Sequence, residues 1–310
     1  MSQSDKIRTL LQNGMARLKE LFIESFKADK RKDSNKLFSL SIIGRPIEER
    51  RIDTVMDIDI IVLLNDPMTL EKYNKIENIF SNLQNYENKD ALVSYKIADG
   101  PIKPLPVKKH NIFFHVLLHT IKSYRDSPLV LVKNSWQHES KAILGLPISK
   151  IERINGVTLD ELLNGKLGIK HCKKLITDSS STFLEWMGRK DNDDKLSISL
   201  KPIRFSENHE LLEICYYSVL RAASNTLRYL KKITKGIGID IKDMIEFEKT
   251  YGSFKKSKLP IDMYYEKAKL RKGEYHPLHR DAILRMEQSL EFLTRLEREL
   301  INSNDADIIK

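Results

Sequence analysis

The chain has 310 residues, of which 41% are hydrophobic and 31% charged, with 53 Lys and Arg against 43 Asp and Glu and a formal net charge of +10. This composition is ordinary for a folded globular protein, and it excludes a fibrous repeat and a largely disordered chain. The apolar runs at 58–64 and 112–118 are far shorter than the roughly 20 residues that cross a bilayer, so no membrane partner is expected.

The cysteine content and the net charge bear on the cellular location and on the partners to be expected. Cys172 and Cys215 are the two cysteines of the chain, too few for a disulfide framework or a clustered zinc site. The first residues lack the apolar core of a signal peptide, so we expect a cytoplasmic location. The excess of basic residues attracts polyanions, although their scatter along the chain favours solvated surface over a dedicated nucleic-acid patch.

The N-terminal third alternates helical and extended patterns. Residues 5–26 carry apolar side chains at helical spacing, and residues 36–43 form a predicted strand that ends at a glycine. Residues 56–64 are apolar on both faces beyond Asp59, as in a strand inside a covered sheet. A helix over 70–83 and a strand over 91–98 follow, so this part predicts an α/β layer.

The middle of the chain is less regular. Residues 111–124 are predicted to be helical, although their apolar and aromatic density also suits a buried strand. Residues 127–136 predict a short extended segment, and the Gly- and Pro-rich stretch 144–168 supports no assignment. From residue 207 the pattern is mainly helical, with helices predicted over 210–232, 241–251, 261–270 and 278–301.

Two carboxylates stand out in the second predicted strand. Side chains alternate along a strand, so Asp57 and Asp59 share one face while Ile58 and Ile60 point to the opposite layer. Carboxylates this close repel one another unless they are solvated or share a cation, and oxygen ligands suit magnesium or manganese. The simpler alternative is a strand that begins with polar residues after a turn.

The surrounding residues resemble the core of the DNA polymerase β-like nucleotidyltransferase superfamily. In that family a strand ends in Gly-Ser, about nine to thirteen residues follow, and Asp-x-Asp begins the next strand. Here Gly44 takes the glycine position, the eleven residues 46–56 intervene, and Asp57 begins the Asp-x-Asp motif. The resemblance extends over residues 5–99. It departs from the family at Arg45, which replaces the serine.

The resemblance implies how the site residues would work. Asp57 and Asp59 would hold two Mg²⁺ or Mn²⁺ ions, and Asp99, at the end of the third predicted strand, is the candidate for the family's third carboxylate. An ordinary Asp-Gly turn is the alternative for Asp99. Gly44 would let the backbone approach the triphosphate. Arg45 could bind phosphate bidentately, or could mark a site that has lost activity.

The implied fold and activity are those of a metal-dependent nucleotidyltransferase. Residues 1–125 would form an α/β (α+β) nucleotidyltransferase domain, and residues 126–310 a mainly α-helical domain on the acceptor side of the cleft. The enzyme would move a nucleoside monophosphate from a nucleoside triphosphate such as ATP to an acceptor hydroxyl. Net charge slightly favours RNA, such as tRNA, as the acceptor. The alternatives are a small antibiotic-like acceptor, and a non-catalytic module of the same fold that binds RNA or a partner.

Three other patterns in the sequence each have a simpler explanation. On a helix, His115 and His119 would lie on one face like a zinc pair, but packing or surface histidines are favoured. Arg271 and His276 have the Arg-x4-His spacing of HEPN ribonucleases, although Gly273 favours a loop between two helices. The two tryptophans lie in polar surroundings that suit base stacking or core packing equally: Trp136 and Trp186.

Overall fold

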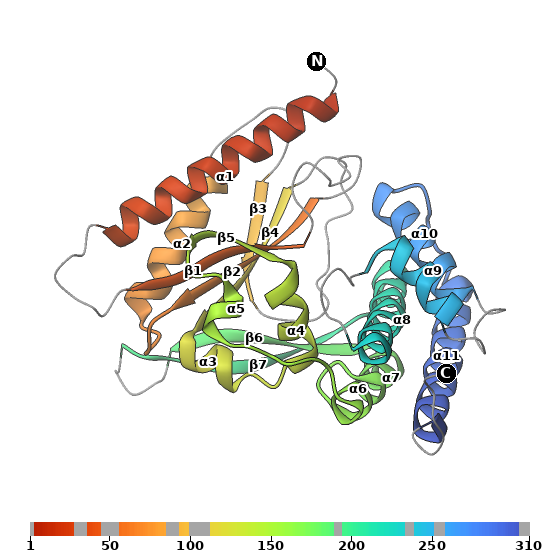
Figure 1. Cartoon of the computed structure of the whole chain (residues 1–310). Helices are drawn as coiled ribbons and strands as arrows, with labels where there is room; N and C mark the ends of the chain where they lie inside the picture. Colours follow the sequence, from red (N-terminus) through yellow and green to blue (C-terminus); the bar gives the residue numbers. More distant parts are fainter. Residues whose placement is uncertain are drawn as a thin grey trace.

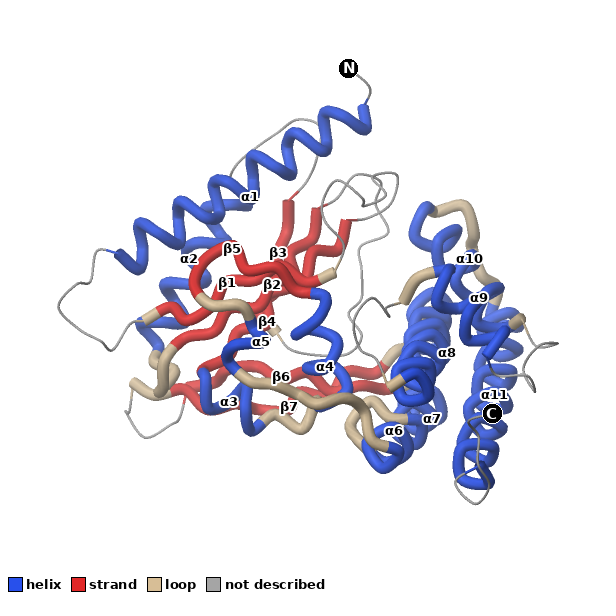
Figure 2. The backbone as a smooth tube through the Cα atoms, in the orientation of Figure 1, coloured by secondary structure: helices blue, strands red, loops and turns tan. Residues whose placement is uncertain are grey.

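In the computed structural model of the chain, one mixed five-stranded sheet lies beside a group of helices (Figures 1 and 2). The structure describes residues 3–27, 36–44, 56–84, 93–98, 112–188, 194–232, 239–250 and 258–303. The predicted mixed α/β class and helical C-terminal part are both confirmed.

The sheet has the strand order β3-β4-β2-β1-β5. The central strand β2 is parallel to β4 and antiparallel to β1, while β3 and β5 form the two edges. One edge strand of the sheet, β5, therefore comes from beyond residue 126. The predicted division into residues 1–125 and 126–310 stays a prediction. The strands are β1 Leu37–Ile43, β2 Met56–Leu64, β3 Val93–Ile97, β4 Ile112–Thr120 and β5 Ser140–Gly145.

One face of the sheet is covered by α1 (Gln3–Lys27) and α2 (Leu70–Gln84), which lie together beside the strands in Figure 1. Alternate residues of β2, beginning at Ile58 and Ile60, are fully buried against them, together with Phe22 of α1. Burying a large apolar side chain contributes about 1.5–3 kcal/mol, so this face is a main source of stability. The helices α1 and α2 were predicted correctly because each has one apolar stripe, and β1 and β2 because each is a short apolar run that ends at turn residues.

The opposite face of the sheet joins a second core that continues into the helical part. The long helix α8 (Asn208–Lys231) packs against α7 (Ile169–Asp178) and against three helices that follow it in the chain. These are α9 Ile241–Thr250, α10 Leu259–Lys272 and α11 His279–Ser303. The short helices α5 (Ile148–Ile151) and α6 (Leu159–Asn164) connect the sheet to this group.

The helix predicted over 111–124 was wrong. Residues 112–120 form strand β4, all nine of whose residues are buried, and only then does the short helix α3 (Ile121–Asp126) begin. A strand covered on both faces between two neighbours shows no period-2 alternation, so its sequence does not differ from that of a buried helix. Thr120 ends the strand and caps α3 by accepting a hydrogen bond from the Ser123 amide.

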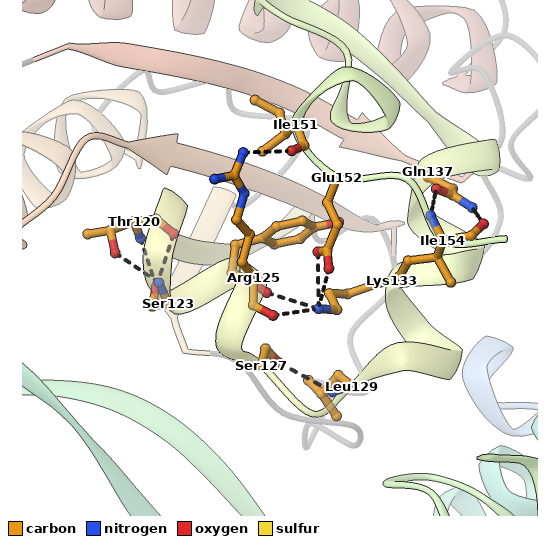
Figure 3. Close-up of polar contacts among 11 residues, drawn as sticks. Thr120, Ser123, Arg125, Ser127, Leu129, Lys133, Gln137, Ile151, Glu152 and Ile154 are labelled. Atoms are coloured by element: carbon orange, nitrogen blue, oxygen red, sulfur yellow. Dashed lines mark hydrogen bonds and ion pairs between the residues drawn. The ribbon is translucent and has the colours of Figure 1, made fainter. Parts of the chain in front are cut away.

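The extended segment predicted over 127–136 was also wrong, because residues 130–139 form helix α4 (Val130–Glu139). Polar residues of this helix are buried together with its apolar ones. Its sequence therefore lacks the alternation of an apolar and a polar face that predicts a helix. The ammonium of Lys133 donates to the Tyr124 and Arg125 carbonyl oxygens at 3.2 and 3.1 Å and pairs with Glu152 at 3.1 Å (Figure 3). Lys133 thereby holds the end of α3 against α4.

A two-stranded hairpin of β6 (Ser180–Gly188) and β7 (Leu196–Arg204) completes the fold. It lies near the carboxyl ends of the parallel strands, where the indole nitrogen of Trp186 donates to the Leu118 carbonyl at 2.8 Å. Lys96 of β3 stacks its ammonium 4.7 Å from the ring centre of Phe183. Within the parts of the chain that the structure describes, no helix is long and apolar enough to span a membrane.

Candidate active site

Strand β2 places Asp59 at its amino-terminal end, on the face opposite Ile58 and Ile60. That face is the one toward α4 and the second core, since Ile61 and Leu63 continue it there. The Asp59 side chain is 38% exposed, so its carboxylate reaches the surface of the fold. Asp57 lies two positions earlier, where its backbone pairs with Phe113.

Asp59 is fixed by a histidine from the neighbouring strand. In the parallel pairing of β2 and β4, Asp59 is aligned with His115, and His115 Nδ1 lies 2.9 Å from Asp59 Oδ1. A carboxylate only accepts hydrogen bonds, so Nδ1 carries the proton. Only 4% of the His115 side chain is exposed, so the ring has little freedom and fixes the orientation of the carboxylate.

Gly44 approaches the same end of the sheet. Ile42 pairs with Ile60, so the chain continues from there alongside the first residues of β2. Gly44 has φ +89°, a left-handed conformation that favours glycine, and its amide donates to the Glu139 carbonyl at 2.9 Å. The turn that leaves β1 is thus tied to the end of α4, beside the carboxylate strand. Arg45 lies outside the described residues.

The strand order shows which strand lies next to the Asp-x-Asp strand, where the resemblance expects a third carboxylate. Asp99 itself lies outside the described residues, and the strand before it, β3, is separated from β2 by β4. The last described residue there, Ala98, donates its amide to Val116 of β4 at 3.1 Å. The residues of the neighbouring strand aligned with Asp57 and Asp59 are Phe113 and His115. A histidine therefore stands beside the Asp-x-Asp strand on β4.

A buried polar seam between α4 and α8 adjoins Gly44. Arg228 is fully buried and forms an ion pair with Glu139 and a hydrogen bond with Ser135, and Arg221 donates to the same serine at 3.3 Å. Burial raises the pKa of Glu139, while burial lowers the pKa of Arg228 to about 10, which still leaves the guanidinium charged near neutral pH. The backbone of Glu139 holds Gly44 and its side chain holds Arg228.

Sequence reasoning missed this seam, although α8 contained a signal for it. Arg221, Asn225 and Arg228 recur at helical spacing in a part of α8 whose residues are largely buried, and such a stripe indicates a buried polar contact. Both polar atoms of the Asn225 amide, and those of Asn134 on α4, are buried and make no hydrogen bond with described residues. Buried amides without a partner are costly, so polar ligands or water are expected there.

The donor chemistry fits a hard cation at Asp59. Carboxylate oxygens are the ligands that Mg²⁺ and Mn²⁺ prefer, and a carboxylate ligand is commonly oriented by a hydrogen bond from a second residue, as His115 provides. Among the described residues no three His, Cys, Asp or Glu side chains are grouped to hold a metal. Asp59 is the candidate ligand that the described side chains supply.

The histidine pair is not a metal site. His115 and His119 share one face of strand β4, and four residues of strand at about 3.3 Å each separate them by roughly 13 Å. One ion cannot bind both. His119 instead packs edge-on against Tyr124, with 6.0 Å between ring centres. His119 therefore has a packing role, while His115 orients Asp59.

The Arg-x4-His spacing and Trp136 are also explained by packing. Helix α10 ends at Lys272 with Gly273 in the left-handed conformation, so Arg271 and His276 do not share a helix. Arg271 pairs with Glu213 of α8 at 2.8 Å. Trp136 is buried in the core and stacks on Tyr124.

Comparison with known proteins adds no assignment, because no protein-family model and no curated protein sequence matches the chain.

Proposed function

We propose that the protein is a metal-dependent nucleotidyltransferase that moves a nucleoside monophosphate from a nucleoside triphosphate to an acceptor hydroxyl. One observation carries the proposal: Asp59 presents a partly exposed carboxylate, oriented by buried His115, at the sheet end that Gly44 approaches. A polar stretch at the start of an ordinary strand does not require a buried histidine to hold one carboxylate in place.

The roles follow from these positions. The acceptor oxygen attacks the α-phosphorus, forming a new P–O bond while the bond to the bridging oxygen breaks and pyrophosphate leaves. Asp57 and Asp59 would hold magnesium or manganese, which would neutralise charge on the phosphates. Asp99 stays the candidate that takes the proton of the acceptor hydroxyl. Gly44 leaves room for the triphosphate beside the backbone, and Arg45 supplies positive charge.

RNA is the favoured acceptor, on the ground of the net charge of +10. A small hydroxylated acceptor is the alternative within the same chemistry. A non-catalytic binding module is the alternative from another class, and it requires neither the Asp-x-Asp carboxylates nor a metal.

The test is label transfer. The protein is incubated with each α-labelled nucleoside triphosphate, Mg²⁺ or Mn²⁺, and separate RNA, protein and metabolite extracts. Asp59→Asn keeps the shape of the side chain and removes its charge. Glu77→Gln is the matched control, because Glu77 is exposed on α2, which covers the other face of the sheet.

We expect transfer by the wild type and by Glu77→Gln, and a loss of at least about 100-fold in Asp59→Asn, because a ligand that stabilises transition-state charge is removed. The labelled extract then identifies the acceptor class. Absence of transfer with every nucleotide, metal and extract, together with absence of metal-dependent nucleotide binding, would leave the binding module as the better account.

A further inference from the structure

A pocket of about 410 Å³ lies at the carboxyl ends of β2 and β4, away from Asp59. It opens where β2 and β4 finish, between the 66–68 loop, helix α3 and the β6–β7 hairpin. Leu64 ends β2 five residues after Asp59, roughly 16 Å further along the strand. The carboxyl ends of parallel strands are where open α/β sheets commonly bind ligands, and this volume lies in the range of small-molecule sites.

The walls of the pocket are fixed by hydrogen bonds, so the cavity is preformed. The Leu196 amide donates to the Met68 carbonyl at 2.9 Å, and the Leu70 amide to the Asp194 carbonyl at 2.8 Å, which tie the hairpin to the loop after β2. The buried ammonium of Lys72 donates to the carbonyls of Asn65 and Pro67 at 2.9 and 2.6 Å. A ligand would therefore bind with little cost for ordering the protein.

One wall is apolar. Trp186 and Ile198 are cross-strand partners on the hairpin face that lines the pocket, with Leu184 and Leu196 beside them. The indole N–H of Trp186 donates to the Leu118 carbonyl, which fixes the ring. The N–H group therefore needs no hydrogen bond from a ligand, and the ring offers its apolar surface. Ile198 is 38% exposed, an apolar surface that an aromatic or alkyl body would remove from water.

The other wall is polar and rich in acceptors. Asp66 accepts one bond from the Lys122 amide at 3.1 Å, and Asp126 pairs with the Lys122 ammonium at the exposed rim. The Ser123 hydroxyl already donates to the Thr120 carbonyl at 3.1 Å, as Figure 3 shows. The Ser123 hydroxyl hydrogen is thus engaged. Lys122 offsets one of the two negative charges, so Asp66 and Asp126 leave this wall with a net charge of −1 and with carboxylate oxygens that retain capacity to accept.

We propose that this pocket binds a small organic amine with an aromatic or alkyl body, which packs on Trp186 and Ile198 and donates N–H groups to Asp66 and Asp126. The site is independent of the proposed nucleotidyl transfer, because it lies at the opposite end of β2. The chain has two tryptophans, one in this pocket and one in the core, and they provide an internal comparison.

The experiment uses the full chain labelled with 5-fluorotryptophan and followed by fluorine NMR. The probes are 1-naphthylmethylamine, the neutral alcohol 1-naphthalenemethanol and the anionic 1-naphthylacetate. Three variants are compared with the wild type: Asp66→Asn, Ile198→Lys and, as a control at the other end of the strand, Asp59→Asn. The Trp136 resonance reports whether each variant keeps its core.

We expect the amine to shift the Trp186 resonance in a saturable way and to leave Trp136 unmoved. It should bind at least about 10-fold more tightly than the acetate, which is about 1.4 kcal/mol. Asp66→Asn should weaken amine binding several-fold, Ile198→Lys should abolish it and Asp59→Asn should leave it unchanged. The proposal is overturned if no probe gives a saturable shift, if both resonances move together, or if the acetate binds as tightly as the amine.

Discussion

His115 is the residue on which the candidate active site depends most directly. It lies on β4, in register with Asp59, and donates its Nδ1 proton to that carboxylate. Its position on a neighbouring strand is invisible in the sequence, where the two residues are 56 apart. Asp59 could be identified from the Asp-x-Asp pattern, but its partner required the strand order.

Replacing His115 tests this dependence. His115→Leu fills the site without a donor, and we expect 10–100-fold weaker metal binding or activity, the usual range for residues that orient a ligand. His115→Asn retains an N–H donor and should keep more of both. Manganese binding is measured by electron paramagnetic resonance, beside label transfer. Full metal affinity and activity in a folded His115→Leu protein would show that the contact is only structural.

His171 gives a pH dependence of stability. Its Nδ1 accepts from the Leu167 amide at 2.9 Å, and burial, with smaller contributions from Lys166 and Lys174, lowers the pKa of His171 to about 4. The ordinary value is about 6.5, so the unfolded chain takes up the proton first. The contribution of neutral, buried His171 to the free energy of unfolding is therefore complete above about pH 6.5 and is lost as the pH falls toward 4.

The size of this effect can be measured by urea unfolding between pH 7.5 and 4.5. A depression of this size corresponds to at most about 3 kcal/mol. His171→Gln keeps a polar side chain that does not titrate, so its free energy of unfolding should fall less steeply across this range. Identical slopes for the wild type and the variant would contradict the assignment.

At the scale of elements, the sequence predicts helices with one apolar stripe and short apolar strands that end at turn residues, and it fails for β4 and α4. The helices α1 and α2 were evident from their apolar stripes. Strand β4 has no exposed residue, and α4 buries even polar side chains such as Lys133 and Asn134. In both cases the partner that covers the second face comes from distant sequence, so local periodicity carries no information about it.

The link between α3 and α4 should be costly to break. Lys133→Met removes a buried ammonium that donates to the Tyr124 and Arg125 carbonyls and pairs with Glu152 (Figure 3). The Tyr124 carbonyl then keeps only the bond from the Ser127 amide, and Glu152 loses its ion-pair partner. We expect a loss of roughly 3–5 kcal/mol in the free energy of unfolding. Chemical denaturation monitored by circular dichroism measures it.

Glu152→Gln is the matched control for that variant. The Glu152 side chain is 26% exposed, so water replaces part of what is lost, and Lys133 keeps both carbonyl acceptors. Its loss should be clearly smaller, about 1–2 kcal/mol. Equal losses in the two variants would assign the stabilisation to the ion pair alone and not to the carbonyl contacts.

At the scale of the whole molecule, the net positive charge predicts how acceptor binding depends on salt, and this dependence differs between RNA and a small acceptor. If RNA is the acceptor, phosphate contacts release counterions, and affinity should fall by more than about 10-fold between 50 and 200 mM salt. Filter binding of labelled RNA at several salt concentrations measures this. A small hydroxylated acceptor should bind with little dependence on salt, and this outcome would remove the argument from net charge.

The general class of the fold could be predicted from sequence, and its assembly could not. Alternating apolar runs indicated a layered N-terminal part and a helical C-terminal part, as found, whereas β5 and the β6–β7 hairpin were not predicted. The placement of β4 between β3 and β2, and of β5 outside β1, depends on pairings between distant segments. Those pairings decide which residue stands beside Asp59 and where the pocket beside Trp186 opens.

The position of β5 at the outer edge of β1 also has a consequence for biosynthesis. About 100 residues separate the two strands, which at roughly 5–20 residues per second is about 5–20 s of translation. Throughout that interval a nascent chain carries β1 with one side unpaired, and an unpaired strand edge is a template for association with other chains. The growing polypeptide would thus be a client for ribosome-associated chaperones until residue 145 has emerged.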